Sequence, residues 1–189
     1  MARNAIKADG TAPLTRISYW LTVVGQEKEY FSELIESLAA LFGGPTFAPH
    51  LTIYSGPAGK NDPARLLAEA IGQGGELRLP CTGLDFSENF TKACYLTFES
   101  ATPLESLSEK LRQNSRPSER YHLKPHLSLF YGKLTRENRQ RIKGMVELPE
   151  IVRFGGLAAV ATTAATKSSR DVLRWQLLAS RELTALPES

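Results

Sequence analysis

Two histidines, each near the start of a similar eight-residue segment, are the residues best suited to chemistry in this sequence. The segments are PHLTIYSG at 49–56 and PHLSLFYG at 125–132, which are identical at four positions and conservatively related at three others. The chain contains three histidines, and two of them, His50 and His126, take the same place in these segments. A repeat of this kind is typical of a fold built from two related units.

A hydroxyl side chain follows each of these histidines two residues later, Thr52 after His50 and Ser128 after His126. Side chains alternate faces along a strand, so each histidine shares a face with its hydroxyl, opposite the aliphatic residues. If the two halves face each other, two imidazoles and two hydroxyls meet in one cleft. This set suits phosphodiester cleavage, because one imidazole can accept a proton from water and the other can protonate the leaving oxygen. The hydroxyls can donate to the non-bridging phosphate oxygens.

Other reaction types find little support in the sequence. No carboxylate follows either histidine at ligand spacing, and two histidines alone make a poor metal site, so we expect no metal and no cofactor. The sequence has no G-x-S-x-G nucleophile elbow. The glycine-containing stretch at 56–60 lacks the spacing of a phosphate-binding P-loop.

The elements that must position these groups follow from the hydrophobic periodicity. We expect strands at 16–24, 50–55, 76–86, 93–99, 126–131, 151–163 and 171–180, with turns near 87–91 and 166–169. We expect helices at 27–42, 63–71, 103–114 and 135–146. Because hairpins and helices are interleaved, the pattern predicts an α+β fold with a mostly antiparallel sheet. Residues 1–13 are expected to be a flexible leader before a single bilobed domain at 14–189.

A second, shorter repeat lies upstream of each histidine. WLTV at 20–23 resembles YLTF at 95–98, so each half is expected to run strand, helix, and then a strand that opens with histidine. We therefore expect two lobes related by a pseudo-twofold axis, with helices outside and a central cleft. Trp20 and Tyr95 would either line this cleft and stack a base or pack in the core.

The composition describes an ordinary globular chain. It has 189 residues, 42% of them hydrophobic and 23% charged, and a formal net charge of +3, which suits a small anionic ligand better than a nucleic acid. No apolar run is long enough to cross a membrane and no secretory signal is present, so we predict a cytoplasmic protein. We also predict a monomer. Its two cysteines are expected opposite Thr97 (for Cys81) and Leu84 (for Cys94), which argues against a disulfide.

The paired H-x-[ST]-x segments resemble those of the 2H phosphoesterase superfamily, and the resemblance covers about residues 17–180. It is closest to the plant-type cyclic phosphodiesterases, which the segment FGGPTFAP at 42–49 and the residues Trp20 and Tyr131 resemble in type and position. The resemblance implies hydrolysis of 2′,3′-cyclic nucleotides or of ADP-ribose 1″,2″-cyclic phosphate to phosphomonoesters. Tyr131 would join the site only if its strand ends near Phe130, because strict alternation turns it away from His126.

Carried to this chain, the resemblance makes His50 and His126 catalytic and makes Thr52 and Ser128 phosphate ligands, without saying which histidine is the acid. Trp20, Tyr95 and Tyr131 become candidate substrate-binding residues. Two alternatives stay open. One is an RNA end-processing enzyme of the 2′,5′-ligase or phosphodiesterase type, with RNA ends as partners. The other is a nucleotide- or RNA-binding module without catalysis.

One loop offers charge for a larger substrate. Arg116, Arg120 and Lys124 make the segment before the second histidine basic. They would either meet a second phosphate of a dinucleotide-like substrate or form a solvated loop. His122 in the same segment is expected to be a loop residue, since Pro125 prevents a helical pairing with His126.

Overall fold

The computed structural model describes residues 14–59, 61–72, 75–115 and 121–184, so the predicted leader at 1–13 lies outside the described residues. The strands are β1 (Leu14–Val23), β2 (His50–Pro57), β3 (Leu77–Phe86), β4 (Cys94–Phe98), β5 (His126–Phe130), β6 (Ile151–Thr163) and β7 (Gln176–Glu182). The helices are α1 (Gln26–Phe42), α2 (Pro63–Ile71), α3 (Thr102–Ser115), α4 (Arg136–Lys143) and α5 (Ser169–Val172), with a short 3-10 helix, η1 (Phe90–Lys92).

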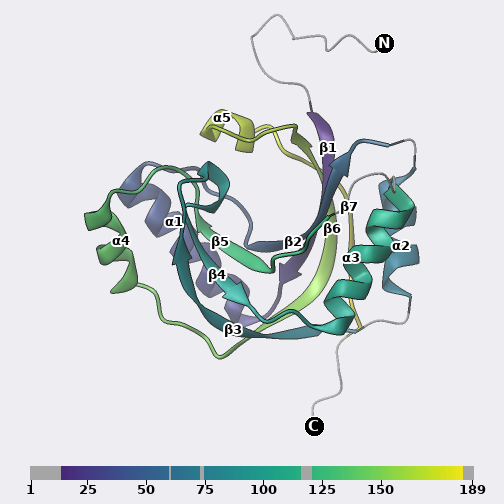
Figure 1. The fold of residues 1–189 in the computed structure, drawn as a ribbon, viewed down its shortest axis with the longest axis horizontal. Coiled ribbons are helices and arrows are strands. Elements are labelled where there is room, and N and C mark those ends of the chain that lie inside the picture. The colour runs from purple at the N-terminus through teal and green to yellow at the C-terminus, as the bar shows by residue number, and fades with distance from the viewer. Residues whose placement is uncertain (1–13, 60, 73–74, 116–120, 185–189) are drawn as a thin grey trace, which may run out of the picture.

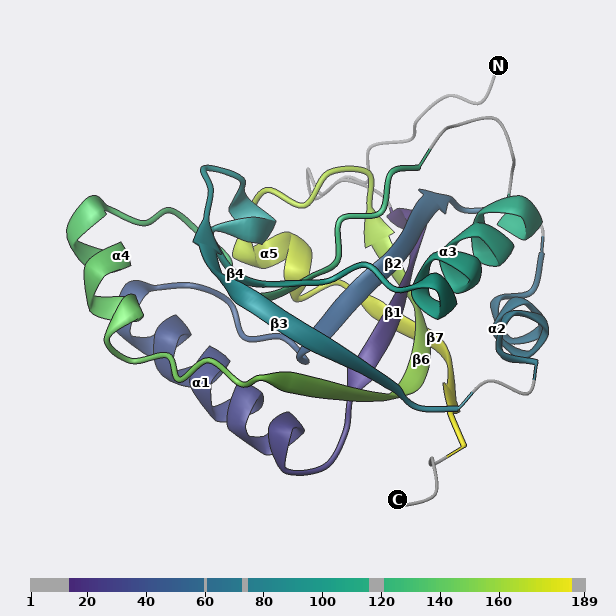
Figure 2. The ribbon, with the colours of Figure 1, turned by 60° about the horizontal axis from the view of Figure 1, so that its bottom comes forward.

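Seven strands form one sheet in the order β1-β2-β5-β4-β3-β6-β7, and an additional β1–β6 pairing joins six of them into a ring. Every pairing between these strands is antiparallel. The sheet curves strongly, with α1 and α4 on one side and α2 and α3 on the other (Figure 1), and Figure 2 shows the same division from a second direction. The predicted α+β class with an antiparallel sheet and outer helices is confirmed.

The internal repeat appears in the strand register. The unit β1-α1-β2 corresponds to β4-α3-β5, and the second strand of each unit pairs with its first. The matched pairs are Trp20↔Thr52 with Tyr95↔Ser128, Leu21↔Leu51 with Leu96↔Leu127, and Thr22↔His50 with Thr97↔His126. The two units meet where Leu51 pairs with Leu127, and each helix crosses over, α1 to contact β5 and α3 to contact β2. The predicted pseudo-twofold relation therefore runs between β2 and β5.

We call the line along which β2 pairs with β5 the seam between the two repeat units. Aliphatic side chains at this seam form the centre of the core. Leu21, Leu51, Leu96 and Leu127 have no solvent-exposed surface. Burial of a leucine side chain contributes about 1.5–3 kcal/mol, so the seam that positions the histidines is also a main source of stability. The alternation of side chains then directs the neighbouring polar residues to the opposite face.

Two local predictions were wrong. Residues 169–172 form α5 where a turn and the start of a strand were expected, and β7 begins only at Gln176. The helix forms because the Ser168 hydroxyl caps it by accepting from the Asp171 N–H, while the Asp171 carboxylate accepts from the Lys167 N–H. The predicted helix at 135–146 ends as α4 at Lys143, followed by Gly144.

Both cysteines are free, as predicted. The register of the hairpin that carries them differs from the predicted one. Cys81 pairs with Phe98 rather than Thr97, and Cys94 pairs with Phe86 rather than Leu84. The register therefore differs from the expected one by two residues at Cys94 and by one at Cys81, because a register shift lies between Cys81 and Gly83, and such a bulge is not visible in the hydrophobic pattern. Within the described ranges, no helix has the length and apolarity needed to cross a membrane.

Candidate active site

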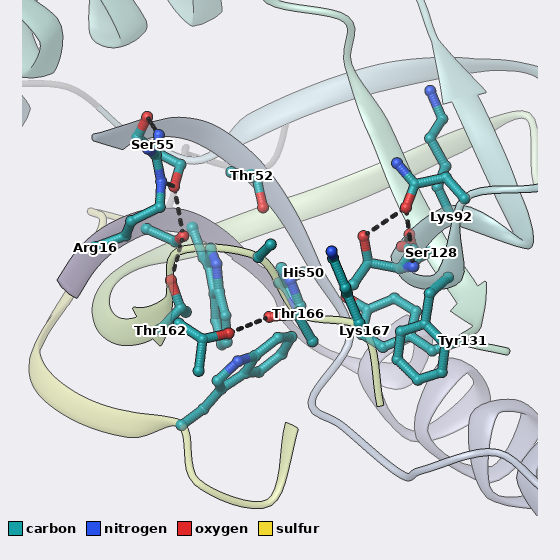
Figure 3. Close-up of a pocket in the computed structure, with 18 of the residues that line it drawn as sticks. Arg16, His50, Thr52, Ser55, Lys92, Ser128, Tyr131, Thr162, Thr166 and Lys167 are labelled. Atoms are coloured by element: carbon teal, nitrogen blue, oxygen red, sulfur yellow. Dashed lines mark hydrogen bonds between the residues drawn. The ribbon is translucent and has the colours of Figure 1, made fainter. Parts of the chain in front are cut away.

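A cavity of about 530 Å³ opens at the seam between the two repeat units, and all four motif side chains line it. His50 and Thr52 enter from β2, and His126 and Ser128 enter from β5. Figure 3 shows His50, Thr52 and Ser128 directed toward the same space. The structure therefore brings together the four residues that the sequence predicted to meet.

The register of β2 and β5 explains this convergence. Because the strands are antiparallel and Leu51 pairs with Leu127, His50 lies across from Ser128 and Thr52 lies across from His126. The leucines point into the core, so the residues on either side of them point into the cavity. Each histidine thus lies near the hydroxyl of the other repeat unit as well as its own.

Both imidazoles are held in the same orientation by the backbone. The Nδ1 atom of His50 lies 2.7 Å from the carbonyl oxygen of Ala48, and that of His126 lies 2.7 Å from the carbonyl oxygen of Lys124. A carbonyl only accepts, so each neutral imidazole carries its proton on Nδ1. This leaves Nε2 of each ring as the nitrogen with a lone pair for a ligand or a water molecule.

Burial keeps these imidazoles neutral. Removal of His50 from solvent lowers its pKa to about 4. The nearby His126 also lowers this pKa, whereas the hydrogen bond with the carbonyl of Ala48 raises it. Burial also lowers the pKa of His126, and the ammonium of Lys92 adds to this effect. His50 is the more deeply buried of the two, with 6% of its surface exposed. At neutral pH, His50 is therefore a base rather than a cation.

Trp20 lines the cavity and also packs against a motif residue. Its ring stacks on His50 with 3.7 Å between centroids and an interplanar angle of 15°. Trp20 was expected either to line the cleft or to pack in the core, and the structure agrees with both in part, because the residue lines the cavity and is also buried. The stack fixes the plane of the imidazole and removes one of its faces from water.

Tyr131 also lies in the cavity, because β5 ends at Phe130 and the alternation stops there. Its ring stacks on Phe47 at 3.8 Å. Burial raises the pKa of Tyr131, and a hydrogen bond with Ser128 opposes that shift. The phenol and the serine hydroxyl therefore belong to one polar cluster.

Tyr95 does not line the cavity and is buried, so of its two expected placements the structure agrees with packing in the interior. Its hydroxyl donates to the carboxylate of Asp85 at 2.8 Å, and the ammonium of Lys92 lies over its ring, 4.1 Å from the centroid. A base cannot stack on a face that a lysine covers. Tyr95 instead contacts the edge of the His126 ring, with 5.7 Å between centroids.

Several lining residues were missed by the sequence analysis. Lys92 and Lys167 reach the cavity from the segments that follow β3 and β6, and Arg16 reaches it from β1. Trp175 packs edge-on against Trp20, at 5.5 Å between centroids. Arg16 could have been found, because alternation places it on the face of Trp20. Trp175 could not, because α5 was not predicted.

The cavity is free of acidic side chains within the described part of the chain. No group of three or more His, Cys, Asp or Glu side chains suited to a metal ion occurs among the residues described. Of the basic loop, Arg116 and Arg120 lie outside the described residues, and Lys124 and His122 are exposed in a segment without regular structure. The cavity is thus a site of positive potential that suits an anionic ligand.

Known proteins resemble this chain in sequence and in fold. Residues 16–183 match the family model described as cyclic phosphodiesterase-like protein. The cyclic phosphodiesterase of Arabidopsis thaliana is 26% identical over 124 residues, which are 65% of this chain and 68% of that protein. The crystal structure of E. coli LigT in apo form aligns with a TM-score of 0.55 and 17% identity, covering 90% of this chain and 98% of that chain. A crystal structure titled only as a phosphoesterase aligns with a TM-score of 0.57 and 17% identity, covering 90% and 99% of the two chains. As its motifs predicted, this chain belongs to the cyclic phosphodiesterase-like family of 2H phosphoesterases.

Proposed function

We propose that this protein hydrolyses 2′,3′-cyclic nucleotides or ADP-ribose 1″,2″-cyclic phosphate to phosphomonoesters, with His50 as general base and His126 as general acid. The observation that carries this proposal is the convergence of two histidine–hydroxyl pairs in one cavity, with both Nδ1 atoms bonded to main-chain carbonyls. Family membership and the name of the Arabidopsis relative support the same reaction class.

In this scheme, Nε2 of His50 takes a proton from a water molecule, and the water oxygen attacks phosphorus. The bond from phosphorus to one ring oxygen breaks, and that oxygen receives a proton from His126, which yields a phosphomonoester and a free hydroxyl. The deep burial of His50 suits the base, because it arrives neutral. A bound phosphate anion raises the pKa of His126, which suits the acid.

Hydroxyls and cations would stabilise the charge that builds on the non-bridging oxygens. Thr52 and Ser128 lie across from the opposite histidines and can donate to the phosphate. The Ser128 hydroxyl donates to the carbonyl of Thr91 at 2.9 Å in the free protein, so it would rotate when substrate binds. Lys92 and Lys167 supply positive charge from the rim. No metal enters this scheme.

The cavity favours a nucleotide-sized ligand. Crystal structures of E. coli LigT are titled as complexes with 3′-AMP, NADP+ and ATP, so a fold of this kind accommodates nucleotides. For the RNA end-processing alternative, the end of an RNA strand would enter this cavity from the solvent to reach the histidines. For the alternative of a binding module without catalysis, two imidazoles in fixed orientations would not be needed. A small cyclic phosphate substrate, a monomeric state and a cytoplasmic location remain our predictions for this chain.

The test is hydrolysis in the presence of EDTA, with products identified across 2′,3′-cyclic nucleotides, ADP-ribose 1″,2″-cyclic phosphate and an oligonucleotide with a 2′,3′-cyclic end. We expect turnover of the small substrates by wild-type protein and by His122→Ala, a control that alters an exposed loop histidine. A clear preference for the oligonucleotide would favour the RNA end-processing alternative. Binding with no turnover of any substrate would contradict the proposal.

A further inference from the structure

We propose a second anion subsite, formed by Arg16, Ser18 and Ser55, which binds a non-reacting phosphate of the substrate. The inference rests on the proposed function and deepens it. It selects cyclic phosphates that carry a second phosphate group, such as a 5′-phosphate or a diphosphate, over those with the cyclic phosphate alone. All three residues line the same cavity as the two histidines.

The strand pattern builds this subsite. Arg16, Ser18 and Trp20 alternate along β1 and face the cavity. On β2, an extra residue sits between the partners of Tyr19 and Trp20, so the register shifts there. The shift turns Ser55 to the same face as Thr52 and pairs it with Ser18, where regular alternation would have turned it away.

Hydrogen bonds hold the guanidinium of Arg16 in place. Its Nη2 donates to the carbonyl oxygen of Ser55 at 2.7 Å, and its Nε donates to the hydroxyl of Ser55 at 3.4 Å. The Ser18 hydroxyl lies 2.9 Å from the Ser55 hydroxyl and 3.4 Å from that of Thr162. The cluster is therefore a fixed arginine with connected hydroxyls.

The charge of this cluster is not neutralised nearby. None of the ion pairs found among the described residues includes Arg16, and the described lining of the cavity contains no Asp or Glu. The main-chain and hydroxyl acceptors use only part of the guanidinium, which presents its remaining N–H groups in a planar fork. Such a fork is suited to phosphate oxygens.

The cluster lies apart from the reacting centre. Ser55 pairs with Ser18 and Thr52 pairs with Trp20, so the two β2 residues are separated by two residues of β1, about 6.6 Å at about 3.3 Å per residue. Figure 3 shows Arg16 and Ser55 at one end of the pocket and Lys92 and Ser128 at the other. In the proposed scheme, Lys92 acts on the reacting phosphate from its place near His126. A second cation at the opposite end therefore matches a second anionic group on the same ligand.

The test compares adenosine 2′,3′-cyclic phosphate with its 5′-phosphorylated form and with ADP-ribose 1″,2″-cyclic phosphate. We expect Arg16→Gln to lower kcat/KM about 10- to 100-fold for the substrates with additional phosphates, and less than about threefold for the first, because charge-assisted hydrogen bonds carry this range. Arg78→Gln is the matched control, since it removes an exposed cation that does not line the cavity.

Thermal unfolding of each variant separates binding from stability, because Arg16 also links β1 to β2. If Arg16→Gln unfolds early, Arg16→Lys takes its place, with a several-fold loss expected only for the substrates with additional phosphates. Equal losses on all substrates, or no loss, would overturn the second subsite while leaving the proposed reaction intact. If wild-type protein turns over none of them, the proposed function fails. In that case, calorimetry compares the binding of adenosine 2′,3′-cyclic phosphate and of its 5′-phosphorylated form to wild-type protein and to Arg16→Gln, and this comparison tests the second subsite independently of turnover.

Discussion

Acidification from pH 7 to pH 5 should destabilise this protein through His50. The folded state holds this imidazole in its neutral form, with a pKa of about 4 that burial causes. In the unfolded chain a histidine titrates near pH 6.5, so between these two values the unfolded state binds more protons. The stability that neutral His50 contributes is therefore present above about pH 6.5 and is lost as the pH falls toward 4.

The size of the effect follows from the two pKa values. Integrated from pH 7 to pH 5, the linkage relation gives a loss of about 2 kcal/mol in the free energy of unfolding for His50 alone. The lowered pKa of His126 adds a loss of the same sign. Paired carboxylates contribute little over this range, because they protonate mainly below pH 5.

Urea unfolding, followed by tryptophan fluorescence at pH 7, 6 and 5, measures this loss. His50→Gln removes the titrating group and should flatten the pH dependence by about 2 kcal/mol, whatever its effect on absolute stability. His122→Gln, an exposed loop position, should leave the slope unchanged. The reasoning is refuted if wild-type protein and His50→Gln lose the same free energy between pH 7 and pH 5.

Three further predictions concern the stability of the seam between the repeat units, the pKa of His126 and the activity of the protein without a metal ion. Leu127→Ala should lower the free energy of unfolding by about 2–5 kcal/mol in a denaturant titration, because it opens a cavity where the repeat units meet. Lys92→Gln should raise the pKa of His126 in an NMR titration, because it removes a neighbouring positive charge. Dialysis against EDTA should leave kcat within about twofold of its starting value, because the proposed acid–base scheme uses only side chains.

Each of these has a clear contrary result. A Leu127→Ala protein as stable as wild type would mean that the seam is not a main source of stability. An unchanged or lower His126 pKa in Lys92→Gln would mean that this lysine does not act on the imidazole. Loss of activity in EDTA that zinc or magnesium restores would replace the two-histidine scheme with a metal-assisted one.

The repeat made the centre of the site predictable. In each of the two segments, the histidine and the hydroxyl residue are two positions apart, so they lie on the same face of their strand. Antiparallel pairing of the two strands places these faces side by side. The spacing could not reveal the bulge in β2, which turns Ser55 toward the cavity and so builds the Arg16 cluster. A bulge depends on packing between strands rather than on the local sequence pattern.

Two aromatic residues near the site were the hardest to place. Trp175 was expected inside a strand, but the Ser168 cap and the Asp171 carboxylate form α5 just before it, and the ring then packs against Trp20. Tyr95 occupies the place that the repeat predicts on β4, yet Lys92 covers its ring. Equivalent positions in a repeat therefore share a backbone without sharing a role.

The most direct test of the central claim is the rate of 2′,3′-cyclic AMP hydrolysis by His50→Ala, His126→Ala and the double variant, each in EDTA. If the two imidazoles act as one acid–base pair, each single change should cost roughly 1000-fold or more in kcat. The double change should then cost little beyond the larger single effect, because groups that act as a unit are not additive. Near-normal turnover by either single variant would contradict the claim that both histidines share the reaction.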